Sequence, residues 1–207
     1  MFDIDGTLIE SYDLDSEIFC SSVKEVTGIE LNSNWSKYNH VTDSGILKEF
    51  FKANDITNTK DTEAKIKQVF ISGLEKSIAS NPIKEIPGAK SFLALLLSMD
   101  NVVVSIATGG WYESAILKLR SASIELNSLS IASSNDYMSR TEIMKCAASK
   151  ATGGKVYPCT YFGDGKWDKQ ACEKLGYNFV AVGDKVKHNQ KITCFSLPNK
   201  ALSYVGL

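Results

Sequence analysis

Histidine and proline are scarce in this sequence, with 2 and 4 residues among 207. The five cysteines form no Cys-x-x-Cys pair, and with so few histidines they supply no ligand set for a structural zinc ion. Their odd number and wide spacing also argue against a disulfide framework. We therefore expect reduced, mostly buried thiols in a cytoplasmic protein.

Long apolar runs and an excess of one charge are missing as well. No stretch approaches the roughly 20 apolar residues that cross a bilayer, and no basic region precedes an apolar one as in a signal peptide. The formal net charge is -1, so no basic field would attract nucleic acid or an anionic surface. We expect neither nucleic acid nor a membrane as a partner.

Three segments are predicted to be buried strands that end in glycine turns. They are residues 102–107, 159–162 and 178–182. Short runs that are apolar on both faces are typical of a parallel sheet covered on both sides. Residues 128–133 and 193–197 are weaker candidates, and Met1 to Ile4 would be the first strand. Because the first motif begins at residue 2, we expect the native chain to start a few residues earlier.

Helical patterns lie between these strands. Apolar residues recur at helical spacing within 92–97, 143–147 and 167–175. Ser139 and Glu142 have the form of a capping box, which predicts a helix that begins near Arg140.

Residues 12–85 show helical periodicity without convincing strands. The sequence therefore predicts an α/β fold: a Rossmann-like open parallel sheet with helices on both faces, and a small all-helical domain inserted after the first strand. We expect a core domain of residues 1–11 and 86–207 and an inserted domain of residues 12–85.

Asp3 and Asp5 stand at the end of the first predicted strand, just before a glycine turn. In extended backbone, residues i and i+2 point to the same side, so both carboxylates could reach one ligand beyond the carboxyl end of the strand. Two such groups repel unless a cation or proton lies between them, and Mg²⁺ prefers oxygen ligands. Taken alone, the pair could equally be an ordinary turn feature.

Two more strands end in polar residues. Asp164 and Asp168 follow residues 159–162, although Asp168 could simply favour a helix dipole. Thr108 and Gly109 follow residues 102–107, where a hydroxyl and free amides could cradle a phosphate. A plain strand-to-helix turn explains them equally well.

A cation is expected near a transferred phosphoryl group, because its oxygens carry charge in the transition state. Arg140 is our first candidate, since the start of its predicted helix faces the same edge of the sheet. An exposed surface arginine is the alternative, and Lys145 is the reserve candidate for the role.

Together these residues resemble a known family. The string FDIDGTL is similar to the first motif of the haloacid dehalogenase superfamily. Ala107-Thr108-Gly109 resembles its second motif, Arg140 its basic third motif, and GDGKWD its acidic fourth motif. The motifs occur in the family's order over essentially the whole chain, and the helical insert resembles the family's cap domain. The third motif is more often lysine, which presents a point charge in place of a planar fork.

The resemblance implies a magnesium-dependent phosphatase that acts on a small phosphate monoester. Asp3 would be the nucleophile and form an aspartyl phosphate, and Asp5 would be the general acid and base. Thr108, Gly109 and Arg140 would bind the phosphoryl group. Asp3, the backbone carbonyl of Asp5, Asp164 and a supporting Asp168 would hold Mg²⁺.

Asp5 separates the alternatives within the superfamily, because members that cleave carbon–halogen or carbon–phosphorus bonds generally lack it. A phosphomutase would keep all four motifs, but the family's hexose phosphate mutases tend to carry a histidine early in the cap. Tyr12 to Phe19 contains none, which favours hydrolysis. A binding module without turnover is the alternative from another class.

The leaving group would be recognised by the cap. The candidate residues are aromatic or polar, and most such side chains simply pack in cores. They are Trp35, Tyr38, His40, Trp111 and Tyr112.

Overall fold

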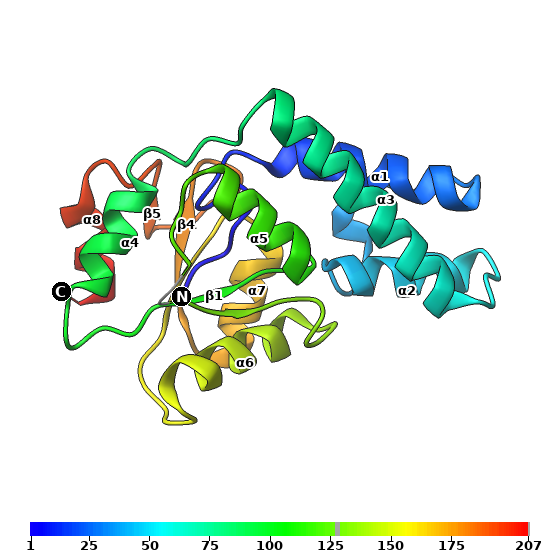
Figure 1. Cartoon of the computed structure of the whole chain (residues 1–207). Coiled ribbons are helices and arrows are strands. Elements are labelled where there is room, and N and C mark those ends of the chain that lie inside the picture. The colour runs from blue at the N-terminus through cyan, green and yellow to red at the C-terminus, as the bar shows by residue number, and fades with distance from the viewer. Residues whose placement is uncertain (127–128, 207) are drawn as a thin grey trace.

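The computed structural model describes residues 1–126 and 129–206, and Figure 1 shows their arrangement. It is an α/β core with a helical cap to one side. The core strands are all parallel: β1 (Ser105–Ala107), β2 (Ser130–Ala132), β3 (Thr160–Gly163), β4 (Asn178–Val182) and β5 (Lys191–Ile192). No helix among the described residues is both long enough and apolar enough to span a bilayer.

Met1 to Asp3 forms the centre of the sheet. Phe2 bridges Ile106 of β1 on one side and Phe162 of β3 on the other, both in parallel register. The amide of Phe2 donates to the carbonyl of Ser105 at 2.9 Å, and the amide of Asp3 donates to that of Phe162 at 2.9 Å. The spatial order is therefore β2, β1, the N-terminal segment, β3, β4 and β5, which confirms the open parallel sheet.

Two helical layers cover the sheet, because alternate strand residues point to opposite faces. Phe2, Ile106 and Phe162 pack with α4 (Ala89–Leu97), α5 (Tyr112–Ser121) and α8 (Pro198–Val205). The intervening Ala107 and Tyr161 pack with α6 (Arg140–Thr152) and α7 (Lys166–Leu175). Parallel strands covered on both faces explain why the strands are buried along nearly their whole length.

The cap is built from α1 (Tyr12–Thr27), the short helix η1 (Trp35–Lys37), α2 (Asp43–Ala53) and α3 (Thr59–Ser80). These helices bury their own apolar cluster, which includes Phe19, Phe50 and Phe70. Trp111 from the core joins this cluster, 5.7 Å from both the Phe19 and the Phe70 ring. Two linkers connect cap and core, and they pair with each other where the amide of Glu10 donates to the carbonyl of Lys84.

The structure corrects several predicted elements. The strand within 102–107 begins only at Ser105, and residues 102–104 border a cavity. The strand within 159–162 runs one residue later, from Thr160, and the strand at 178–182 is confirmed. In the 128–133 prediction, the strand covers Ser130–Ala132, and residue 128 lies outside the described residues.

The strand predicted at 193–197 is wrong, and β5 lies at Lys191–Ile192 instead. Phe195 is buried, and its ring stacks on Phe92 of α4 at 5.2 Å, which makes the segment apolar without making it a strand. Its amide donates to the carbonyl of Pro87 rather than to a ladder.

The helix predicted near Arg140 begins at that residue, but the expected capping box does not form. The hydroxyl of Ser139 pairs with that of Thr141 at 2.8 Å, and no side chain in the described part of the chain caps α6. All five cysteines are free thiols.

Candidate active site

A small cleft of 80 Å³ lies between the cap and the carboxyl ends of the central strands. Its core side is formed by loops that follow three adjacent parallel strands, which is where open α/β sheets place their ligands. Its cap side comes from α1, η1 and α2. The predicted residues that line it are Asp3, Asp5, Trp35, Thr108, Gly109, Arg140 and Asp164.

Asp3 and Asp164, which line this cleft, form an acidic trio with Asp168, which does not line it. One carboxylate oxygen from each lies within 4.8 Å of the others, and all three residues are buried. Burial raises the pKa of Asp3 well above its usual value, and repulsion from Asp168 adds to this effect. Burial, together with the charge of Asp168, also raises the pKa of Asp164 to about 6. Ionisation of all three neighbouring carboxylates is unfavourable unless a cation lies between them.

Arg140 provides one compensating charge. Its Nη1 lies 2.9 Å from Asp168 Oδ1 and 3.4 Å from Asp3 Oδ1, and its Nη2 donates to the carbonyl of Val41 in the cap. Burial alone would lower the pKa of Arg140, but Asp168 raises it. The surface-arginine alternative is thus wrong, and so is the reserve candidate: Lys145 is exposed and pairs with Glu142.

The trio fits a hard divalent cation. Its three possible ligand groups are all carboxylates, and hard cations prefer oxygen ligands. Oδ1 of Asp164 is buried without a hydrogen-bond partner in the described structure, while Oδ2 accepts a hydrogen bond from Lys185 at 2.8 Å. Gly6 makes room for this group: its φ is +78°, and a Cβ there would lie 2.1 Å from Asp164 Oδ2. Asp168 also accepts from the amide of Gly165, so it orders the start of α7 as well as facing the trio.

Thr108 and Gly109 follow β1 as predicted, but not all of their backbone is free. The amide of Thr108 donates to the carbonyl of Ala132, and its hydroxyl accepts from the amide of Gly110 at 3.1 Å. A Cβ on Gly109 would lie 2.3 Å from Arg140 Nη2, so glycine is what lets the guanidinium pass. The main contribution of this turn is therefore to let Arg140 approach the backbone closely. It offers fewer free backbone amides for a phosphate than the sequence predicted.

Asp5 is held by a residue that the sequence analysis missed. Nζ of Lys118 on α5 lies 2.6 and 2.7 Å from the two carboxylate oxygens of Asp5, and 2.5 Å from Asp15 of α1. The hydroxyl of Ser11 also donates to Asp5 at 2.5 Å. Lys118 is 1% exposed. The available signal was its place beside Ala115 and Leu119 on the buried face of an amphipathic helix.

The residues proposed to read the leaving group divide in two. Trp35 lines the cleft, whereas Tyr38, His40 and Tyr112 do not. Trp111 is buried inside the cap cluster and acts there as packing.

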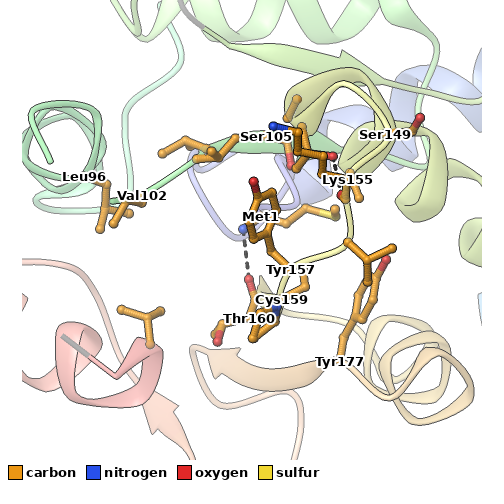
Figure 2. Close-up of a pocket in the computed structure, with 18 of the residues that line it drawn as sticks. Met1, Leu96, Val102, Ser105, Ser149, Lys155, Tyr157, Cys159, Thr160 and Tyr177 are labelled. Carbon is orange, nitrogen blue, oxygen red and sulfur yellow. Dashed lines mark hydrogen bonds between the residues drawn. The ribbon is translucent and has the colours of Figure 1, made fainter. Parts of the chain in front are cut away.

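A larger cavity lies elsewhere. It measures 620 Å³ and opens at the amino ends of the strands, beside Met1, Ser105 and Thr160 (Figure 2). The terminal amine of Met1 donates there to the carbonyl of Thr160 at 2.9 Å. Lys145 borders this cavity, and none of the acidic trio does. The smaller cleft therefore remains the candidate active site, because two carboxylates of the acidic trio line it and none lines the larger cavity.

Comparison with known proteins places the chain in context. A family model described as haloacid dehalogenase-like hydrolase matches residues 1–182. No curated protein sequence matches the chain.

Solved structures share the fold at low sequence identity. A hydrolase from Pseudomonas syringae has a TM-score of 0.71 at 21% identity, covering 91% of this chain and 85% of its own. CbbY from Rhodobacter sphaeroides, solved in complex with phosphate, has a TM-score of 0.73 at 15% identity, with 100% and 97% covered. A predicted phosphoglycolate phosphatase from Haemophilus somnus has a TM-score of 0.64 at 16% identity, with 97% and 95% covered.

Proposed function

Because the chain belongs to the haloacid dehalogenase-like hydrolases, we propose that it is a magnesium-dependent phosphatase that hydrolyses a small phosphate monoester through a phosphoryl group carried by Asp3. The observation that supports this most directly is the buried trio of Asp3, Asp164 and Asp168 with Arg140 beside it. A nucleophilic carboxylate, oxygen ligands for a hard cation and a fixed positive charge meet at one point of the cleft.

The first half of the reaction uses Asp3 and Asp5. A carboxylate oxygen of Asp3 attacks phosphorus as the bond from phosphorus to the ester oxygen breaks, and Asp5 donates a proton to that leaving oxygen. In this structure Lys118 and Ser11 both donate hydrogen bonds to the Asp5 carboxylate. Asp5 must therefore give up one of these hydrogen bonds to reach the substrate. Arg140 and Thr108 would hold the phosphoryl oxygens in place.

The second half restores the enzyme. Asp5, now ionised, takes a proton from water, and the water oxygen attacks the phosphorus bound to Asp3, which releases inorganic phosphate. Bound Mg²⁺, held by Asp3, the carbonyl of Asp5 and Asp164 with support from Asp168, would supply positive charge that offsets repulsion between phosphate and carboxylate.

Residues 12–85 would act as the cap domain and residues 1–11 and 86–207 as the catalytic core. The paired linkers that join them provide a natural hinge, so cap closure would exclude water during the reaction. We place this activity in the cytoplasm, in keeping with five free thiols.

The test is release of inorganic phosphate from a panel of phosphate esters, with and without Mg²⁺. We expect metal-dependent release by the native chain and none by Asp3→Asn. Asp13→Asn, which neutralises an exposed carboxylate on α1, is the matched control and should keep its activity. Release that survives Asp3→Asn would refute the proposed nucleophile. Conversion of a sugar phosphate without net release would instead favour a phosphomutase, and metal binding with neither reaction would favour a binding module.

A further inference from the structure

The cap side of the cleft determines which leaving group can enter. The phosphoryl group must lie near Asp3 on the core side, so the rest of the substrate faces the cap. The cap residues there are Tyr12, Asp15, Ser16, Phe19, Trp35, Val41, Thr42, Asp43 and Ile46. This wall contains two carboxylates and no lysine or arginine among its described residues.

The cations around the cleft are already engaged. Arg140 pairs with Asp3 and Asp168, Lys118 with Asp5 and Asp15, and Lys185 with Asp164. Among the described residues that line the cleft, Arg140 is the only cation, and it faces the nucleophile. A second anionic group on the substrate would therefore meet carboxylates without a free positive partner, which is unfavourable.

Asp43 is held in place by backbone contacts. Its amide donates to the carbonyl of Gly109, and its Oδ2 accepts from the amide of Trp111 at 2.8 Å, so the first turn of α2 is tied to the loop after β1. It is 7% exposed. Burial and the charge of Asp15 raise the pKa of Asp43, because Lys118 only partly offsets them. A ligand cation beside Asp43 would supply the missing compensation.

Aromatic rings complete this wall. Tyr12, Phe19 and Trp35 line the cleft from the cap, and Trp167 lines it from the core. The Tyr12 ring already carries a cation on one face, because Nζ of Lys185 lies 3.2 Å from its centroid. Carboxylates flanked by aromatic faces are the usual surroundings of a bound ammonium group.

The cleft is also small. Its volume of 80 Å³ is far below the roughly 300–1,000 Å³ of ordinary ligand pockets. A leaving group of only a few heavy atoms fits, and a sugar or nucleoside does not fit without cap opening.

We propose that the substrate is the phosphate monoester of a short amino alcohol, whose ammonium group lies against Asp43, Asp15 and the aromatic wall. This inference rests on the phosphatase function proposed above and assigns its leaving group. It excludes esters whose leaving group carries a carboxylate or a second phosphate.

Three esters of nearly equal size test the charge directly: 2-aminoethyl phosphate, 2-hydroxyethyl phosphate and phosphoglycolate. We expect kcat/KM for the ammonium ester to exceed that of the hydroxyl ester by about tenfold or more, equivalent to one ordinary cation–π or ion-pair contribution. The carboxylate ester should be the poorest of the three.

Variants then assign the preference to the wall. Asp43→Asn keeps an oxygen for the amide of Trp111 but removes the charge, so the ratio of kcat/KM between the ammonium and hydroxyl esters should fall toward one. Asp15→Asn should lower the same ratio and serves if Asp43→Asn does not fold. Asp13→Asn on the outer side of α1 should leave the ratio unchanged.

The outcomes separate this inference from the proposed function. Equal rates for the three esters, or a preference for phosphoglycolate, would overturn the assignment of the leaving group while leaving the phosphatase intact. The same holds if none of the three is hydrolysed but 4-nitrophenyl phosphate is, in an Asp3-dependent reaction. Absence of Asp3-dependent release from every ester would overturn both.

Discussion

Replacement of Lys118 by methionine is the sharpest test of how cap and core are joined. Lys118 is 1% exposed and links Asp5 of the core with Asp15 of the cap through one ammonium group. Methionine fills a similar space but leaves both carboxylates without a cation. Breaking a buried ion pair costs about 3–5 kcal/mol in free energy of unfolding. Because the Asp5 and Asp15 side chains remain 17% and 19% exposed, we expect the lower end, about 3 kcal/mol.

The loss should depend on pH in a defined direction. Burial raises the pKa of Asp15 to about 6 in the folded chain, above the roughly 3.9 of an unfolded aspartate. Protonated Asp15 therefore favours the folded state, and this contribution is lost as the pH rises from about 4 through 6. Without Lys118 the ionised form is less favourable still. The difference between native protein and Lys118→Met should thus be smaller at pH 5, where Asp15 is largely protonated and Asp5 alone loses its cation, than at pH 8.

Urea unfolding at both pH values measures this effect, with the slope against urea expected to stay unchanged. Lys145→Met is the matched control, since that exposed lysine pairs only with Glu142 and should cost no more than about 0.5 kcal/mol. A loss below about 1 kcal/mol at pH 8, or one that is equal at the two pH values, would refute the reasoning.

Three further changes have definite expected results. Gly109→Ala should displace Arg140, because its Cβ would lie 2.3 Å from Nη2; kcat for phosphate release should fall by about 100-fold, and unchanged kinetics would contradict this. Phe162→Ala should lower the free energy of unfolding by about 3–5 kcal/mol, because the ring stacks on Phe2 at 4.9 Å in the centre of the core; denaturant titration measures the loss, and a value under about 1 kcal/mol would argue against this packing. Added Mg²⁺ should raise Tm in a concentration-dependent way, since only the folded chain assembles the acidic trio; a chelator should reverse the rise, and a Tm indifferent to Mg²⁺ would count against the site.

Local sequence patterns were sufficient for the main elements of the core. Strands β3 and β4 followed from apolar runs and glycine turns, because a strand buried on both faces and an amphipathic helix have distinct periods. The start of α6 was predicted from Ser139 and Glu142, which have the form of a capping box. Those patterns also placed Asp3 and Asp164 at strand ends and Arg140 at the start of a helix that follows a strand, and in a parallel sheet these positions lie at one edge. The predicted reason for the start of α6 was wrong, since Ser139 makes no cap.

Other features depend on residues far apart in the chain. Residues 193–197 have the composition of a strand, but Phe195 instead fills the core against Phe92. For Trp111 the sequence left open a contact with the leaving group or packing in a core, and the structure places it inside the cap cluster. Local periodicity predicts neither the packing of Phe195 nor that of Trp111, because each depends on side chains from an element far away in the chain.

The sequence by itself determined the order of the motifs, the alternation of strands and helices, and the acidic edge of the sheet, because each of these follows from spacing along a short segment. Only the tertiary structure decided that Lys118 would meet Asp5 and Asp15, which lie 113 and 103 residues away. It also decided that the cap would present carboxylates and aromatic rings to the cleft. Such pairings arise when helices from two domains pack against one edge, and no local pattern specifies them.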